Sequence, residues 1–187
     1  MPSHSATIER VRAALNDSFD AIFPWFDRPA EVRVYKPSDG GWSINQILEH
    51  ITLTTHFLLI IVRKGYPKAL KRAQTQPLEY SESDLEMLIP IGRRDAFPWI
   101  RPEHMEPVGR SADEVLLTMR QQKAECLEVL AKIGSGEGSL YKVRMSVNNS
   151  GRIDLYQWFF FIAQHAKRHI GQMEECLEEW REHQRSA

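Results

Sequence analysis

Two histidines stand four residues apart near the C-terminal end of the sequence. His165 and His169 enclose the segment HAKRH, and in a helix this spacing places both imidazoles on one face. Two ring nitrogens can then converge on one metal ion, about 2.0–2.1 Å from each. Phe161 and Met173 share that face at helical spacing, so we expect both rings to point into the core. An unpaired buried polar group costs about 1–3 kcal/mol, and one metal ion would satisfy both rings.

A third ligand must come from another part of the chain. His50 is the natural candidate because it neighbours an apolar face that includes Ile51. His56 is a weaker one, since six residues further along a helix it points about 120° away from His50. Hydrogen bonds of the histidine pair to backbone, or to residues such as Thr54 and Gln46, are the alternative to a metal. The remaining histidines are expected at the surface: His4, His104 and His183.

Helix-start signals position these histidines. Ser43 and Gln46 have the spacing of a capping box, in which each side chain bonds the backbone amide of the other residue. Ser111 with Glu114 repeats the pattern, and Asp154 with Gln157 marks a further start. The apolar 3–4 spacing predicts four helices. They cover residues 5–26, 44–64, 112–133 and 154–182.

The connections between these helices differ greatly in length. Pro24 ends or kinks the first helix, and Gly65 with Pro67 is expected to stop the second at about residue 64. About 45 residues then precede the third helix, too many for a bare loop in a compact domain. Parts of this stretch are expected to be helical, around residues 68–74 and 81–88, and residues 140–144 suggest a short hairpin or extended arm. The sequence predicts an all-α four-helix bundle with a long crossover between helices two and three.

Composition excludes several kinds of partner. The chain has 25 acidic and 24 basic residues, so no positive excess attracts nucleic acid or an anionic membrane. No apolar run reaches the roughly 18–20 residues that cross a bilayer, and the N-terminal stretch is polar and then amphipathic, unlike a signal peptide. Two cysteines do not make a disulfide framework. We therefore expect a cytoplasmic protein whose residues 1–187 form one domain.

Three stretches together resemble the DinB-like superfamily, which includes the YfiT-type proteins. GWSINQILEHI, residues 41–51, is similar to the signature of its second helix, where a Trp-Ser cap leads into a helix with a metal-binding histidine. Residues 154–172 resemble its last core helix with an HxxxH pair, and AFPWIRP, residues 96–102, looks like its proline-rich crossover. The resemblance covers nearly the whole chain in helix order and spacing.

The resemblance implies a four-helix bundle that holds a divalent ion, zinc or nickel, near one end. The ligands would be His50, His165 and His169, and three protein ligands leave a position open for water or substrate. Some members are thiol-dependent S-transferases that use low-molecular-weight thiols such as bacillithiol or mycothiol, while others have no known reaction. A small-molecule substrate and such a thiol are therefore the expected partners.

Two functions compete. The first is a metal-dependent thiol transferase or hydrolase that acts through a metal-activated thiol or water. The alternative is a non-catalytic, metal-binding stress-response bundle that works as a homodimer. The aromatic run of residues 158–161 favours the second, because four consecutive rings cover most of a helix circumference and one or two are expected at a subunit interface. A metal-free structural bundle is a third reading, and the buried histidine pair argues against it.

Four more residues bear on the site or on its chemistry. Gln172, three residues after His169, can orient a ligand by hydrogen bonding to its outer ring nitrogen, or it can be a plain surface residue. Glu49 points about 100° away from its neighbour on the helix and is expected to be solvated. Cys126 and Cys176 lack an activating partner in the sequence and are expected to be buried thiols.

Overall fold

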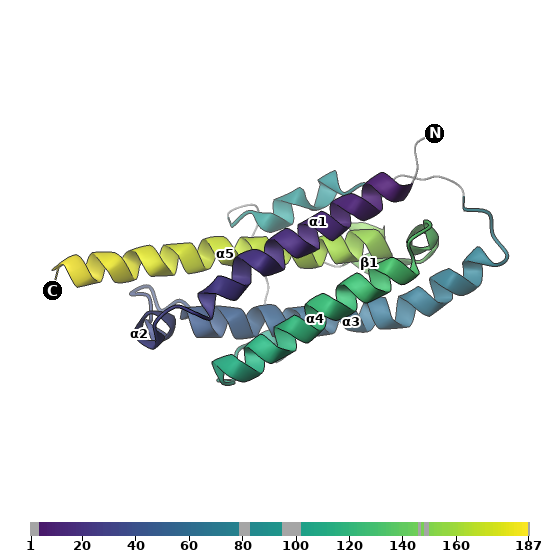
Figure 1. Cartoon of the computed structure of the whole chain (residues 1–187). Coiled ribbons are helices and arrows are strands. Elements are labelled where there is room, and N and C mark those ends of the chain that lie inside the picture. Colours follow the sequence, from purple (N-terminus) through teal and green to yellow (C-terminus); the bar gives the residue numbers. More distant parts are fainter. Residues whose placement is uncertain (1–3, 79–82, 95–101, 146, 148–149, 187) are drawn as a thin grey trace.

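The computed structural model describes residues 4–78, 83–94, 102–145, 147 and 150–186. Four long helices lie side by side along the length of the molecule (Figure 1), with a short helix and a two-stranded hairpin added to them. The α-helices are α1 (His4–Ile22), α2 (Ala30–Val34), α3 (Ile44–Ala73), α4 (Ala112–Lys132) and α5 (Leu155–Ser186). The 3-10 helices are η1 (Phe23–Trp25), η2 (Glu86–Gly92), η3 (Glu103–Met105) and η4 (Glu137–Leu140).

The long helices pack in a closed order around the core. The helix α1 packs on α5 and α4, and α3 also packs on α5 and α4. The helix η2 lies along α5. The prediction of a mostly helical protein therefore fits, although the all-α class omits the hairpin. No described helix has an apolar stretch of the length and hydropathy that a membrane span requires.

The predicted helix starts are confirmed by side-chain caps. The Ser43 amide donates to Gln46 Oε1 at 3.1 Å while the Gln46 amide donates to Ser43 Oγ at 3.4 Å, and an equivalent capping box opens α4 at Ser111. At the start of α5 the amides of Asp154 and Gln157 each donate to the other's side chain at 3.0 Å. Each cap satisfies amides that a helix start leaves without partners.

The helix α3 does not end where the sequence predicted. Gly65 and Pro67 lie inside it and it continues to Ala73, so residues 68–73 belong to α3 and not to a separate helix. Packing against η4 and the residue after it accounts for the extension: Arg72 Nη1 donates to Leu140 O at 2.6 Å and its guanidinium lies over the Tyr141 ring. Tertiary contacts of this kind override the helix-stopping tendency of single residues.

Of the two structures expected at residues 140–144, a short hairpin or an extended arm, the structure has a hairpin, whose first strand begins at residue 142. The strands β1 (Lys142–Met145) and β2 (Gly151–Asp154) pair antiparallel, with Val143 opposite Ile153. Tyr156 fixes the preceding segment, because its hydroxyl donates to Ile133 O at 2.5 Å and accepts from the Gly138 amide at 3.2 Å. Tyr156 of α5 therefore holds the segment between α4 and β1 in place.

The long connection between α3 and α4 is only partly described. Of the helix predicted over residues 81–88, residues 81 and 82 lie outside the described residues. Residues 83–85 are not helical, and residues 86–88 belong to the 3-10 helix η2. Residues 96–101 of the proline-rich stretch also lie outside them. Ser83 Oγ donates to Asp154 Oδ2 at 2.6 Å, so this connection is held to the start of α5.

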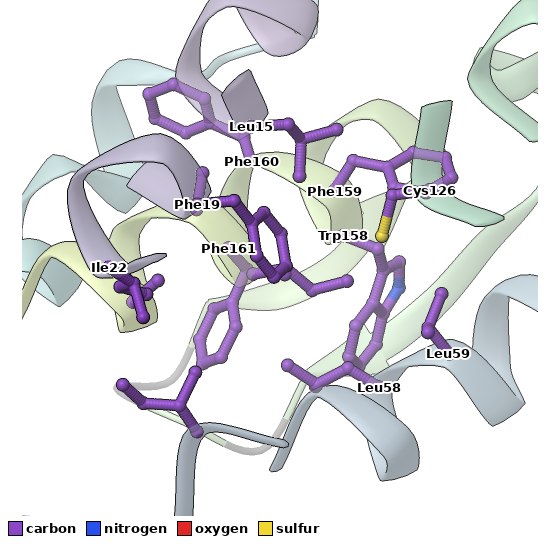
Figure 2. Close-up of a cluster of buried hydrophobic side chains, with 14 of the residues drawn as sticks. Leu15, Phe19, Ile22, Leu58, Leu59, Cys126, Trp158, Phe159, Phe160 and Phe161 are labelled. Atoms are coloured by element: carbon purple, nitrogen blue, oxygen red, sulfur yellow. The ribbon is translucent and has the colours of Figure 1, made fainter. Parts of the chain in front are cut away.

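All four aromatics of the run 158–161 are buried, which contradicts the expectation that one or two reach a subunit interface. Trp158, Phe159, Phe160 and Phe161 are at most 5% exposed. Figure 2 shows their rings pointing in different directions from α5, with Cys126 of α4 among the neighbours. The expectation was wrong because α5 is covered by η2 and the hairpin as well as by α1 and α3.

Candidate metal centre

The helix α5 contributes two buried imidazoles to one point. His165 is 3% exposed and His169 is 7% exposed, and their Nε2 atoms lie 3.1 Å apart. Two nitrogens bound at 2.0–2.1 Å to one tetrahedral ion would be about 3.3 Å apart. The observed separation is therefore close to that of two ligands on a common ion.

The helix α3 brings His50 to the same point. Its ring centroid lies 5.3 Å from that of His165 and 4.8 Å from that of His169, and His50 is 4% exposed. Each of the three histidines offers a donor nitrogen within 4.8 Å of the others, and no other group of this kind is found among the residues that the structure describes. The three residues named from the sequence are thus the three that the fold brings together.

Hydrogen bonds to the outer ring nitrogens direct two of the rings. His50 Nδ1 lies 2.8 Å from the carbonyl oxygen of Met105 in η3. A carbonyl only accepts, so Nδ1 carries the proton. His169 Nδ1 lies 2.9 Å from Gln172 Oε1, which places the predicted orienting residue within hydrogen-bond distance of its histidine. In both rings Nε2 is left to face the cluster.

Burial keeps the pair on α5 uncharged. It lowers the pKa of His165 well below the usual value, and the neighbouring His169 and His50 lower it further. Burial likewise lowers the pKa of His169 to about 3, again with a contribution from His50. At neutral pH both rings are neutral, which is the state in which an imidazole binds a metal ion.

A pocket of about 450 Å³ opens beside the three histidines. Its walls are mostly apolar and come from α3, α5, the hairpin and the connection before α4. Trp42 lies against His50, with ring centroids 4.7 Å apart. The lining side chains other than the histidines are Trp42, Thr54, Leu58, Arg94, Pro102, Met105, Met145, Val147, Trp158, Phe161, Arg168 and Gln172.

The remaining histidines and both cysteines lie away from this chemistry. Of the three histidines predicted at the surface, His104 and His183 are exposed and His4 is half-buried. His56, the weaker ligand candidate, is exposed. Cys126 and Cys176 are buried, and burial raises the pKa of each thiol. Both fit the prediction of buried thiols, since a thiol with a raised pKa is a poor nucleophile.

Two residues near the site were missed or misjudged from the sequence. Glu49 was expected to be solvated but is 1% exposed, and its carboxylate accepts hydrogen bonds from the amides of Val108, Gly109 and Arg110. Met105 contributes a backbone carbonyl, which every residue type has. Neither contact leaves a signal in the sequence, because the partners are separated by more than fifty positions.

The donor set fits a divalent transition ion. Three imidazoles suit zinc or nickel better than the harder magnesium or calcium, which prefer oxygen ligands. Their nitrogens converge inside the protein, and a pocket adjoins the point of convergence. A site with three protein ligands beside a pocket has the form of an open metal site and not of a closed structural one.

Comparisons with known proteins identify the family of this chain. The family model of the DinB superfamily matches residues 5–173, a span that includes all three histidines. The uncharacterized protein YuaE of Bacillus subtilis (strain 168) is 27% identical to this chain over 146 residues, which cover 76% of this chain and 82% of the relative. No solved structure matches the chain significantly.

Proposed function

Because this chain belongs to the DinB superfamily, we propose that it binds one divalent ion, zinc or nickel, through His50, His165 and His169. The observation that carries the proposal is the convergence of three buried imidazoles next to a pocket of about 450 Å³. We further propose that α1, α3, α4 and α5 form a four-helix bundle, with residues 74–111 as its crossover. Their closed packing order supports this topology.

The proposed activity is thiol transfer to a small electrophile. When bound, such an ion lowers the pKa of a thiol or water and can polarise a substrate. Metal-dependent hydrolysis commonly also uses a carboxylate as general base, and no Asp or Glu is among the described residues that line the pocket. A thiolate needs no such base, because it attacks directly once it has lost its proton. The lining therefore favours a transferase over a hydrolase.

The chain's own residues hold the reactants in this proposal. Gln172 fixes the ring of His169 through Nδ1. Trp42, Trp158 and Phe161 provide apolar walls that would exclude water and accept the apolar body of an electrophile. A low-molecular-weight thiol such as bacillithiol or mycothiol is the proposed co-substrate.

A thiol-transfer assay on protein of known metal content tests this function. Purified protein is analysed for bound metal and then incubated with each thiol and 1-chloro-2,4-dinitrobenzene. In the reaction, the sulfur of the thiol forms a bond to the ring carbon and chloride leaves. We expect activity that rises with zinc or nickel content, is lost in His165→Ala and is retained in His56→Ala, which removes an exposed histidine of the same protein. A metal-free preparation as active as the loaded one would contradict the proposal.

The sequence argument for the alternative function, a non-catalytic stress-response homodimer, is not supported by the structure. That argument depended on aromatic side chains of the run 158–161 reaching a subunit interface, and all four are buried within the chain. The homodimer itself stays a prediction, and size measurement in solution tests it.

A further inference from the structure

The carboxylate of Glu49 is buried beside the candidate ligand His50 and binds a segment of backbone. Its Oε1 accepts from the Val108 amide at 3.0 Å, and its Oε2 accepts from the amides of Gly109 at 2.9 Å and Arg110 at 3.2 Å. A buried carboxylate is costly unless hydrogen bonds compensate it, and bonds from backbone amides to a charged acceptor are among the stronger ones. Glu49 therefore holds residues 108–110 firmly against α3.

The backbone at this point is shaped for the carboxylate. Gly109 has φ of +90°, a left-handed conformation that side-chain-bearing residues rarely adopt. This conformation lets three successive amides turn toward one acceptor, an arrangement that binds anions in many proteins. The segment and the carboxylate are thus matched to each other.

The same segment supplies the partner of His50. The chain that Glu49 holds at residue 108 lies three residues after Met105, whose carbonyl oxygen is 2.8 Å from His50 Nδ1. This carbonyl ends η3, a single turn of three residues without a side-chain cap. A turn this short has little stability of its own, so its position depends on what fixes the chain on either side.

We propose that Glu49 is a positioning residue that selects the tautomer of His50. By holding residues 108–110 it keeps the Met105 carbonyl against Nδ1, so the proton stays on Nδ1 and Nε2 faces the other two histidines. Thr54 also contacts both partners, because its hydroxyl lies 3.4 Å from His50 Nε2 and donates to Met105 Sδ at 3.7 Å. The metal-binding part of the inference rests on the proposed function, whereas the tautomer does not.

Glu49 and His50, which are adjacent on α3, thus both contact the short segment of residues 105–110. Their side chains leave α3 about 100° apart, one reaching the amides of 108–110 and the other the carbonyl of Met105. The outer partners of metal-bound histidines typically change metal affinity about 10- to 100-fold when removed. Loss of Glu49 should have an effect of this size although it touches no candidate ligand atom.

The test uses Glu49→Gln, which keeps the shape of the side chain. The amide group presents a donor where the carboxylate accepted, so at least one of the three backbone amides loses its acceptor. Glu179→Gln is the matched control, because Glu179 also fixes a connecting segment by accepting a backbone amide, that of Ser38 at 2.7 Å. Gly109→Ala disturbs the same segment from the other side while leaving Glu49 in place, and it serves if Glu49→Gln fails to fold.

The first readout is the ¹⁵N spectrum of histidine-labelled, metal-free protein, with the His50 signals assigned by their absence in His50→Asn. We expect a protonated Nδ1 in the wild type and in Glu179→Gln, and a shift of the proton toward Nε2 in Glu49→Gln and Gly109→Ala. An unchanged His50 tautomer in both Glu49→Gln and Gly109→Ala would overturn the inference.

The second readout is zinc and nickel affinity, measured by competition with a chelator. We expect Glu49→Gln to bind about 10- to 100-fold more weakly than the wild type, and Glu179→Gln to bind within about threefold of it. Unchanged affinity in Glu49→Gln would overturn the metal-binding part. If wild-type protein bound neither ion while the tautomer still changed in Glu49→Gln, the proposed function would fail and the positioning role of Glu49 would stand.

Discussion

The Nε2 atoms of His165 and His169 lie 3.1 Å apart on successive turns of α5. Both rings are buried, and the lowered pKa of each keeps it neutral at physiological pH. The pair therefore presents nitrogen lone pairs in a place that strongly disfavours a positive charge on the rings themselves. A divalent ion differs from a proton here, because it can be shared by three nitrogens at once.

Zinc or nickel should stabilise the folded protein. An ion that binds only the native state raises the free energy of unfolding by about 4 kcal/mol at a concentration of 1,000 times its Kd. We expect a matching rise in the thermal midpoint for the wild type and for His56→Ala, and little or none for His50→Ala. Differential scanning calorimetry with and without ion measures this, and an equal rise in all three proteins would rule out His50 as a ligand.

The metal-free protein should lose stability as the pH falls below about 6.5. The pKa of His169 is lowered from 6.5 to about 3, so the unfolded chain takes up a proton over a range in which the folded protein does not. Protonation therefore favours the unfolded chain. The contribution of His169 to the free energy of unfolding is complete above pH 6.5 and decreases as the pH falls toward 3. Linkage gives a loss of about 2 kcal/mol from this one group between pH 7 and pH 5.

Urea unfolding at pH 7 and pH 5 measures this loss, with His169→Gln as the comparison. The variant lacks the titrating ring, so its free energy of unfolding should fall less between the two pH values. An identical fall in wild type and variant would mean that His169 takes up its proton equally well in the folded protein.

Phe160→Ala should destabilise the fold and leave the oligomeric state unchanged. Phe160 is 3% exposed, and Arg10 of α1 lies over its ring at 5.5 Å. Truncation of a buried phenylalanine typically costs about 3–5 kcal/mol. Denaturant unfolding and sedimentation, with the exposed Leu117→Ala on α4 as control, separate the two effects. A change in assembly without a loss of stability would restore the interface interpretation of this residue.

Gly65→Ala should be destabilising although alanine is the better helix former. A methyl group at Gly65 would lie 2.8 Å from side-chain atoms of Leu155 and Tyr141, closer than carbon atoms normally pack. Overpacking of this kind costs about 1–3 kcal/mol, more than the roughly 1 kcal/mol that helix propensity returns. Thermal unfolding measures the balance, and a more stable variant would show that α3 can move away from the start of α5.

Local signals explain how much of the site could be predicted. The cap at Ser43 sets the start of α3 and hence the direction of His50, and the four-residue spacing sets the pair on α5. Both depend on residues within one or two helical turns of each other, where sequence and geometry are tightly coupled. The convergence of α3 and α5 came from the resemblance to a known superfamily and not from the spacing itself.

What could not be predicted involves contacts with distant backbone. Glu49 was expected to be solvated because only its neighbours on the same helix could be considered, whereas its partners are amides 59 to 61 positions away. The length of α3 was underestimated for a related reason, since its last turns are held by η4. The burial of the aromatic run likewise depends on η2, which packs against α5. The sequence has no periodic pattern from which this packing could be predicted.

The pocket beside the histidines has walls of two different origins. One wall is α5, where Trp158 and Phe161 also belong to the hydrophobic core, so substitutions there would weaken the fold. Another wall includes Pro102, Met105 and Val147 from connecting segments, which generally tolerate change better than core helices. Substitutions in the connecting segments can therefore alter ligand preference without weakening the core contacts of the helix that carries His165 and His169.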